Sequence, residues 1–75
     1  MKYIITAGLA PILFPDHIDH STFADLKPIS AGFVRLHLNG SKIEAICGGK
    51  SVTLKLDAQA DDYVFIEQLL NKRKD

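Results

Sequence analysis

The sequence contains a single cysteine, Cys47, and no tryptophan, so no disulfide can form within these 75 residues. A lone cysteine is typical of a reducing compartment, and we expect a cytoplasmic protein. Net charge is absent as well, because nine Lys and Arg balance nine Asp and Glu. A chain without net charge has no overall attraction to nucleic acid or to an anionic membrane surface. The apolar runs are shorter than the roughly 20 residues that cross a bilayer, so we expect no membrane partner.

The amino-acid composition of the chain is that of a folded domain. Hydrophobic residues make up 47% and charged residues 24%, a balance that excludes a disordered segment. The length predicts one domain over residues 1–75. A chain of this size buries only about 60% of its unfolded surface, which leaves little room for a large catalytic pocket and favours a partner subunit.

Charge is unevenly distributed along the chain. Residues 72–75 hold three basic side chains and one acidic side chain, so the rest has six basic and eight acidic groups. We interpret 72–75 as a basic, frayed tail after a helix, where cations meet the negative end of the helix dipole. The same three cations resemble a short polyanion-binding patch, which keeps nucleic acid as an alternative partner.

The first part of the chain predicts a hairpin followed by a short helix. Residues 3–6 and 11–14 are short strand-like runs separated by a turn-like break. Ser21 is placed to cap a helix of one to two turns over residues 22–26. Pro28 ends this helix, because the residue before a proline is disfavoured in the helical region.

Two glycine-containing pairs, Asn39-Gly40 and Gly48-Gly49, separate three strand-like segments in the middle of the chain. Asn-Gly is the strongest short hairpin signal, because a type I′ turn needs positive φ at both central residues. If each glycine-containing pair forms a two-residue turn, Leu36 pairs with Ile43. The segment after Gly49 then pairs with the segment between the two turns. Since side chains alternate along a strand, this register predicts one apolar face. Its members are Val34, Leu36, Leu38, Ile43, Ala45, Val52, Leu54 and Leu56.

The opposite face of this predicted meander is mostly polar with one apolar corner. The same register places Arg35 opposite Glu44 and Phe33 opposite Ile46, both favourable cross-strand pairs. An exposed aromatic ring among basic groups is also what single-stranded nucleic acid uses for stacking and phosphate contact. Either solvent or a partner covers this face, and our candidate binding residues are Phe33, Arg35, His37 and Ile46.

The last element is an amphipathic helix. Asp57 is a good N-cap for it. An apolar stripe of Phe65, Ile66, Leu69 and Leu70 predicts packing on the apolar face of the meander. The element order is then ββαβββα. We therefore predict an α+β fold, with a small single layer of antiparallel sheet packed on a C-terminal helix.

Potential metal ligands are concentrated in one segment and comprise Asp16, His17, Asp19 and His20. Two histidines three residues apart can share a metal if the segment is helical, and zinc accepts His and Asp ligands. However, the sequence has no H-E-x-x-H, C-x-x-C or G-x-S-x-G motif. A polar loop ahead of a helix explains the same residues. We therefore expect no cofactor and no catalytic activity, and keep a metal-dependent enzyme using His17 and His20 as an alternative.

Three segments resemble a group of short uncharacterised proteins encoded in bacteriophage and prophage genomes. They are residues 12–24 (ILFPDHIDHSTFA), 30–34 (SAGFV) and 48–52 (GGKSV), which together comprise 23 of the 75 residues. It implies a bacterial or phage cytoplasmic context. It implies no activity, and it transfers no site residue.

Taken together, these features predict a small noncatalytic module that acts through protein–protein contacts. The small core and the exposed strand edges favour self-association, through a sheet edge or through the corner of Phe33 and Ile46. Single-stranded nucleic-acid binding through the outer sheet face and the basic tail is the alternative.

Overall fold

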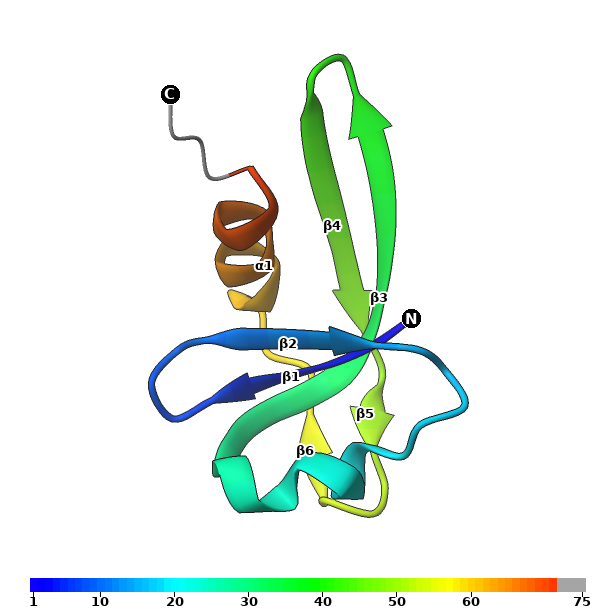
Figure 1. The fold of residues 1–75 in the computed structure, drawn as a ribbon, viewed down its shortest axis with the longest axis vertical. Coiled ribbons are helices and arrows are strands. Elements are labelled where there is room, and N and C mark those ends of the chain that lie inside the picture. Colours follow the sequence, from blue (N-terminus) through cyan, green and yellow to red (C-terminus); the bar gives the residue numbers. More distant parts are fainter. Residues whose placement is uncertain (72–75) are drawn as a thin grey trace.

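The computed structural model describes residues 1–71, and the predicted basic tail at 72–75 lies outside this range. The elements follow one another as two strands, a 3-10 helix, four strands and one α-helix (Figure 1). Their bounds are β1 Lys2–Thr6, β2 Pro11–Phe14, η1 His20–Leu26, β3 Pro28–Asn39, β4 Lys42–Gly48, β5 Lys50–Ser51, β6 Leu56–Asp57 and α1 Asp62–Leu70. The predicted α+β class, the first hairpin and the closing helix are confirmed.

The main sheet has four antiparallel strands in the order β2-β1-β3-β4. Strand β3 is 12 residues long, and its two halves have different partners. The first half pairs with β1, and the second half forms a hairpin with β4 that projects past β2 (Figure 1). Strands β5 and β6 form a small second sheet, which adds to the predicted antiparallel layer.

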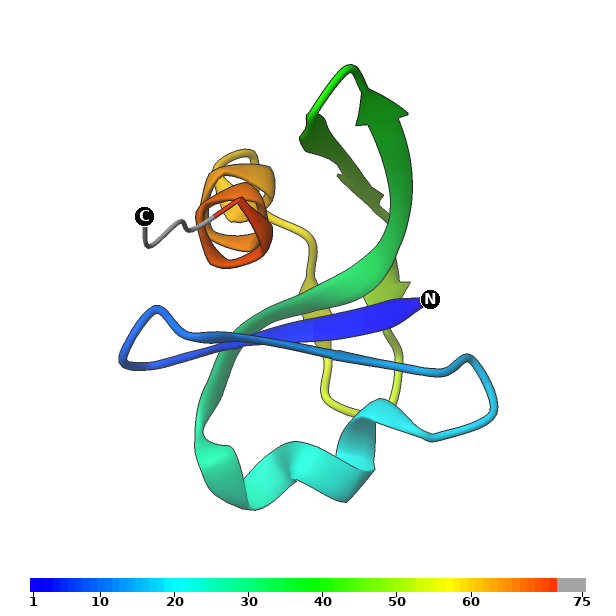
Figure 2. The same cartoon turned by 45° about the horizontal axis from the view of Figure 1, so that its top comes forward.

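Both faces of the main sheet are covered at β1, which is its most buried strand. Tyr3 and Ile5 pack against Ile66 of α1 on one face, whereas Ile4 packs on the other with Phe14 and Ala31. Figure 2 shows α1 and η1 on opposite sides of the β1–β2 hairpin. Burial on both faces explains why β1 reads as a continuous apolar run rather than as an alternating one.

The predicted third strand of the meander was wrong. Residues 50–56 do not pair with β4; Lys50 and Ser51 pair instead with Asp57 and Leu56 across a turn. Strand β1 occupies the other side of β3, which the local sequence pattern did not reveal. As a result Val52 is 75% exposed, and Leu54 and Leu56 pack with Ile4 rather than on the meander's apolar face.

The register of the β3–β4 hairpin differs from the predicted one by two residues. Asn39 pairs with Lys42, so Gly40 and Ser41 are the central turn residues, and only Gly40 has a positive φ, of 64°. A register shift of two residues leaves every side chain on the same face of the sheet, because side chains alternate between the faces with a period of two. The opposed pairs nevertheless change: Ile46 lies opposite Arg35, whereas Phe33 lies opposite Gly48.

The helix boundaries also needed correction. The N-cap position of η1 is Asp19, not Ser21, and no side chain caps it. Helix α1 begins at Asp62, because Asp57 belongs to β6. In the predicted stripe Ile66 is fully buried, whereas Leu69 is 48% exposed and faces away from the core. No helix within residues 1–71 is long and apolar enough to cross a membrane.

Candidate functional site

Four aromatic side chains form a row that leads from the interior to the surface. The ring of Phe14 lies 4.6 Å from that of Phe23 and 5.5 Å from that of His20. His20 in turn meets Phe33 edge to face, at 5.7 Å between ring centroids. His20 is 5% exposed and Phe33 is 45% exposed, so the row ends in an exposed ring.

Hydrogen bonding and packing fix the orientation of this last ring. Nε2 of His20 donates a hydrogen bond to the carbonyl oxygen of Gly32, 2.9 Å away. Because this hydrogen bond holds the His20 ring in place, the edge-to-face contact gives the Phe33 ring a fixed neighbour. Nζ of Lys2 lies 6.0 Å from the centre of the Phe33 ring, at the outer limit of a cation–π contact.

Gly49 makes room for the Phe33 ring. Gly48 lies opposite Phe33 across the ladder, but a Cβ at Gly48 would meet nothing within 4 Å. Gly49 has a φ of 80°, and a Cβ at this position would lie 3.1 Å from Cδ1 of Phe33. The Gly48-Gly49 pair therefore leads the chain out of β4 beside the ring, and the predicted tight hairpin turn at this pair was wrong.

Two surface hollows border Phe33. One, of about 320 Å³, is lined by Phe33, Arg35 and Ile46 together with the backbone around Gly48 and Gly49. The other, of about 250 Å³, brings Lys2 and Lys50 beside the ring. Three cationic side chains thus border the two hollows, where Asp19 is the one acidic lining residue.

The structure brings three of the four predicted binding residues together. Phe33, Arg35 and Ile46 line one hollow, and we call this surface the Phe33 face. Ile46 is 52% exposed, so two large apolar side chains stand in solvent next to a guanidinium group. His37 lies further along β3, opposite Glu44, and does not line the hollow. The predicted pairs of Arg35 with Glu44 and of Phe33 with Ile46 were wrong.

The predicted metal ligands are placed in different surroundings. His20 is buried in the aromatic row, whereas His17 and Asp19 are exposed. Asp16 lies 2.8 Å from the amino group of Met1, and this contact holds the pKa of its carboxyl group below the usual value. Within residues 1–71, no three His, Cys, Asp or Glu side chains come together as a metal site.

A buried polar cluster lies on the opposite side of the sheet, at the start of α1. The carboxyl group of Asp62, which is 2% exposed, accepts hydrogen bonds from the Tyr3 hydroxyl, the Ser30 hydroxyl and the backbone N–H of Gln59. Burial, and then the hydrogen bond to Asp62, raise the pKa of the Tyr3 hydroxyl. None of these residues lines either hollow at Phe33, and among the described residues every buried side-chain nitrogen or oxygen has a hydrogen-bond partner. The cluster therefore joins β1, β3 and α1 and has the properties of a structural contact.

The sequence gives no specific signal for this cluster. Acidic residues are common in the first turn of a helix, so Asp61 and Asp62 at the start of the closing helix indicate an exposed helix end. Nothing in the local pattern indicates which of two adjacent aspartates is buried.

Cys47 lies near this cluster, and burial followed by the Asp62 charge raises the pKa of its thiol to about 11. A thiol with this pKa is protonated at neutral pH and is a poor nucleophile.

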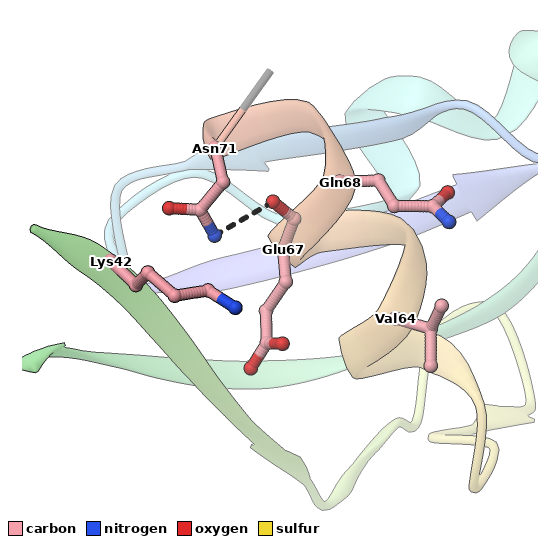
Figure 3. A pocket seen from close by; sticks show the side chains of 5 residues that line it. All are labelled: Lys42, Val64, Glu67, Gln68 and Asn71. Atoms are coloured by element: carbon pink, nitrogen blue, oxygen red, sulfur yellow. Dashed lines mark hydrogen bonds between the residues drawn. The ribbon is translucent and has the colours of Figure 1, made fainter. Parts of the chain in front are cut away.

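Side chains of α1 and of its C-cap residue, Asn71, cover the outer edge of β4. The Asn71 side chain forms two hydrogen bonds of 2.8 Å with the backbone N–H and carbonyl of Ile43, as a neighbouring strand would. Glu67 accepts a hydrogen bond from the Ala45 N–H, also at 2.8 Å. Figure 3 shows these side chains beside Lys42 in a polar hollow of about 390 Å³ between β4 and α1. The β4 edge is therefore closed to strand addition at Ile43 and largely at Ala45.

Prolines protect the other outer strand, β2. The Thr6 N–H donates to Ala10, and the register then directs the backbone groups of Ile12 toward β1. The outward-facing positions are consequently 11, 13 and 15, and two of these are prolines, which have no N–H. A single outward donor remains, on Leu13. Neither outer edge thus offers a full row of donors and acceptors to another strand.

Compared with known proteins, the chain matches no protein-family model, no curated protein sequence and no solved structure.

Proposed function

We propose that this chain is a noncatalytic protein–protein interaction module that binds its partner through the Phe33 face. The observation that carries the proposal is an aromatic ring that is 45% exposed and yet supported by a buried histidine. Interfaces concentrate their binding energy in a few aromatic and Arg side chains near the centre of the contact. The Phe33 face has this composition, with Ile46 and Arg35 beside the ring.

The surroundings of Phe33 favour a preorganised contact. The ring already has its position before binding, so little side-chain entropy is lost when a partner covers it. The 320 Å³ hollow beside it has room for one apolar side chain of the partner. Arg35 can pair with a carboxylate of the partner in a planar, two-bond geometry. We therefore expect a partner segment that combines an apolar anchor with an acidic residue.

A selection from a yeast-displayed library of random peptides tests this proposal. The parent chain is the bait, and Phe33→Ser is used for counter-selection. We expect enriched peptides with an apolar residue close to Asp or Glu, whose affinity falls roughly tenfold or more with Phe33→Ser and with Arg35→Gln. Leu26→Ser is the matched control, because Leu26 is 46% exposed and lies outside the Phe33 face. Peptides that bind the Phe33→Ser chain equally well, or a selection without enrichment, refute the proposal.

Single-stranded nucleic acid is the second candidate ligand of the same face. The observation that favours it is the placement of Lys2 and Lys50 on the side of Phe33 away from Arg35, where cations can meet phosphates while a base stacks on the ring. Fluorescence anisotropy with a labelled oligothymidylate is the test. We expect binding that weakens as salt rises and with Lys50→Gln. Absence of binding at low ionic strength eliminates this candidate.

A phage or prophage origin and a cytoplasmic location remain part of the proposal. The first depends on the three segments that resemble short phage proteins, and the second depends on the lone Cys47. Genes that neighbour the coding sequence test the origin, since a phage module would carry recognisable structural or replication genes on both sides.

A further inference from the structure

A second exposed apolar surface lies on the opposite side of the β3–β4 hairpin. Leu36 and Leu38 alternate with the residues of the Phe33 face along β3, so they point to the other side of the sheet. Leu38 is 69% exposed, and it stands on the part of the hairpin that projects past β2 (Figure 1). Leucine this exposed on an ordered strand is a candidate contact residue.

An apolar hollow of about 560 Å³ lies on the same face as Leu38. Strand β3 contributes Leu36, α1 contributes Leu70, and the remaining lining residues belong to the N-terminus, to β2 and to the two residues after it. The one charged lining side chain, Asp16, is 71% exposed and lies at the rim. The hollow therefore has an apolar wall and no buried charge that a charged ligand could pair with.

We propose that this face joins two copies of the chain, with Leu38 of each copy seated in the hollow of the other. A two-fold interface requires that one surface carry both the projecting group and its complement. Leu38 and the hollow meet this requirement, because Leu36 lines the hollow and is two residues from Leu38 on the same strand. Asp16 at the rim is paired with the amino group of Met1, and the other lining side chains are uncharged, so the surface can face its own copy with little like-charge repulsion.

The alternative ways for this chain to associate with itself are less well supported. Glu67 and Asn71 cover the β4 edge, and the prolines at 11 and 15 leave β2 with a single outward donor. Around Phe33, the side chains of Lys2, Arg35 and Lys50 would approach their own copies in a two-fold contact. The surface formed by Leu38 and the apolar hollow has neither of these obstacles, because its contact needs no strand edge and brings no group of cations together.

The inference is independent of the proposed function, because the two surfaces lie on opposite faces of one hairpin. Sedimentation equilibrium over a concentration series from micromolar to millimolar measures the dimer. We expect the parent chain to dimerise and Leu38→Lys to weaken the dimer roughly a hundredfold, since the two-fold axis removes the contact twice. Leu26→Lys, a matched change at an exposed leucine of η1, is expected to leave the dimer unchanged.

Isotope-filtered nuclear Overhauser spectra of mixed labelled and unlabelled chains locate the contact. Contacts between Leu38 of one copy and Leu70 of the other are the expected result. A parent chain that is monomeric at millimolar concentration overturns the proposal, as does a Leu38→Lys chain that dimerises like the parent. Loss of the dimer in Phe33→Ser also overturns it, because the contact would then lie on the Phe33 face.

Discussion

Replacing Asp62 with alanine tests whether the buried polar cluster stabilises this fold. The substitution removes the carboxylate that accepts the hydrogen bonds of the Tyr3 and Ser30 hydroxyls, which belong to residues that are 0% and 1% exposed. A buried donor left without an acceptor costs about 1–3 kcal/mol, so the two hydroxyls together cost roughly 2–6 kcal/mol. The Gln59 N–H is only partly buried and adds less, because water can replace its acceptor.

This cost is large for so short a chain. At roughly 0.05–0.15 kcal/mol per residue, a domain of this length has a free energy of unfolding of about 4–11 kcal/mol. Urea unfolding followed by circular dichroism at neutral pH measures the change. Asp61→Ala is the matched control, since Asp61 is exposed and its side chain caps no backbone group. We expect this control to change the free energy of unfolding by less than about 0.5 kcal/mol.

A double-mutant cycle separates the unsatisfied hydroxyl from the other effects of Asp62→Ala. In the Asp62→Ala background, Tyr3→Phe removes the donor that has lost its acceptor, and we expect it to recover about 1–2 kcal/mol. In the parent chain Tyr3→Phe is expected to destabilise the fold, because it removes the hydrogen bond between the Tyr3 hydroxyl and Asp62. The reasoning is refuted if Asp62→Ala costs no more than Asp61→Ala, or if Tyr3→Phe has the same effect in both backgrounds.

Three further predictions concern pH, the strand edge and the backbone. Because burial raises the pKa of Cys47 from 9.0 to about 11, its contribution to stability is present below pH 9.0 and is lost as pH rises to about 11. The urea midpoint should fall more across this range in the parent than in Cys47→Ala, and equal falls would contradict the prediction. Asn71→Ala should cost about 1–2 kcal/mol and speed amide exchange at Ile43, which hydrogen-exchange NMR measures; unchanged exchange would show that Asn71 does not cover the edge. Gly49→Ala should cost roughly 1–2 kcal/mol in urea unfolding, since it combines a positive φ with a close approach to Phe33; a neutral effect would refute this.

Local sequence patterns located the first hairpin, the β3–β4 hairpin and the closing helix. The sides of the β3 and β4 residues were also correct despite the wrong turn, because a register error of two residues leaves alternation unchanged. This is why Phe33, Arg35 and Ile46 could be predicted to share a face. The same pattern could not predict that Phe33 lies opposite Gly48, since that pairing depends on which turn residues adopt positive φ.

Strand partners were predicted less well than strands. Residues 50–56 carry a strand-like pattern, and a turn-like glycine pair precedes them, so local reasoning paired them with β4. In the structure β1 takes the remaining side of β3, and the side chains of Glu67 and Asn71 take the remaining side of β4. Distant segments compete for the same strand edges, and this competition decided the strand pairing. A short window of neighbouring residues carries no information about such a competition.

By itself the sequence determined the α+β class, the alternation that places Phe33, Arg35 and Ile46 on one face, and the absence of a disulfide, because these depend on residue types and their spacing. The tertiary structure alone decided that His20 supports Phe33, that Asp62 is buried while Asp61 is exposed, and that Asn71 closes the edge of β4. Each of these contacts joins segments far apart in the chain, and their energies come from burial and hydrogen-bond geometry that exist only after folding.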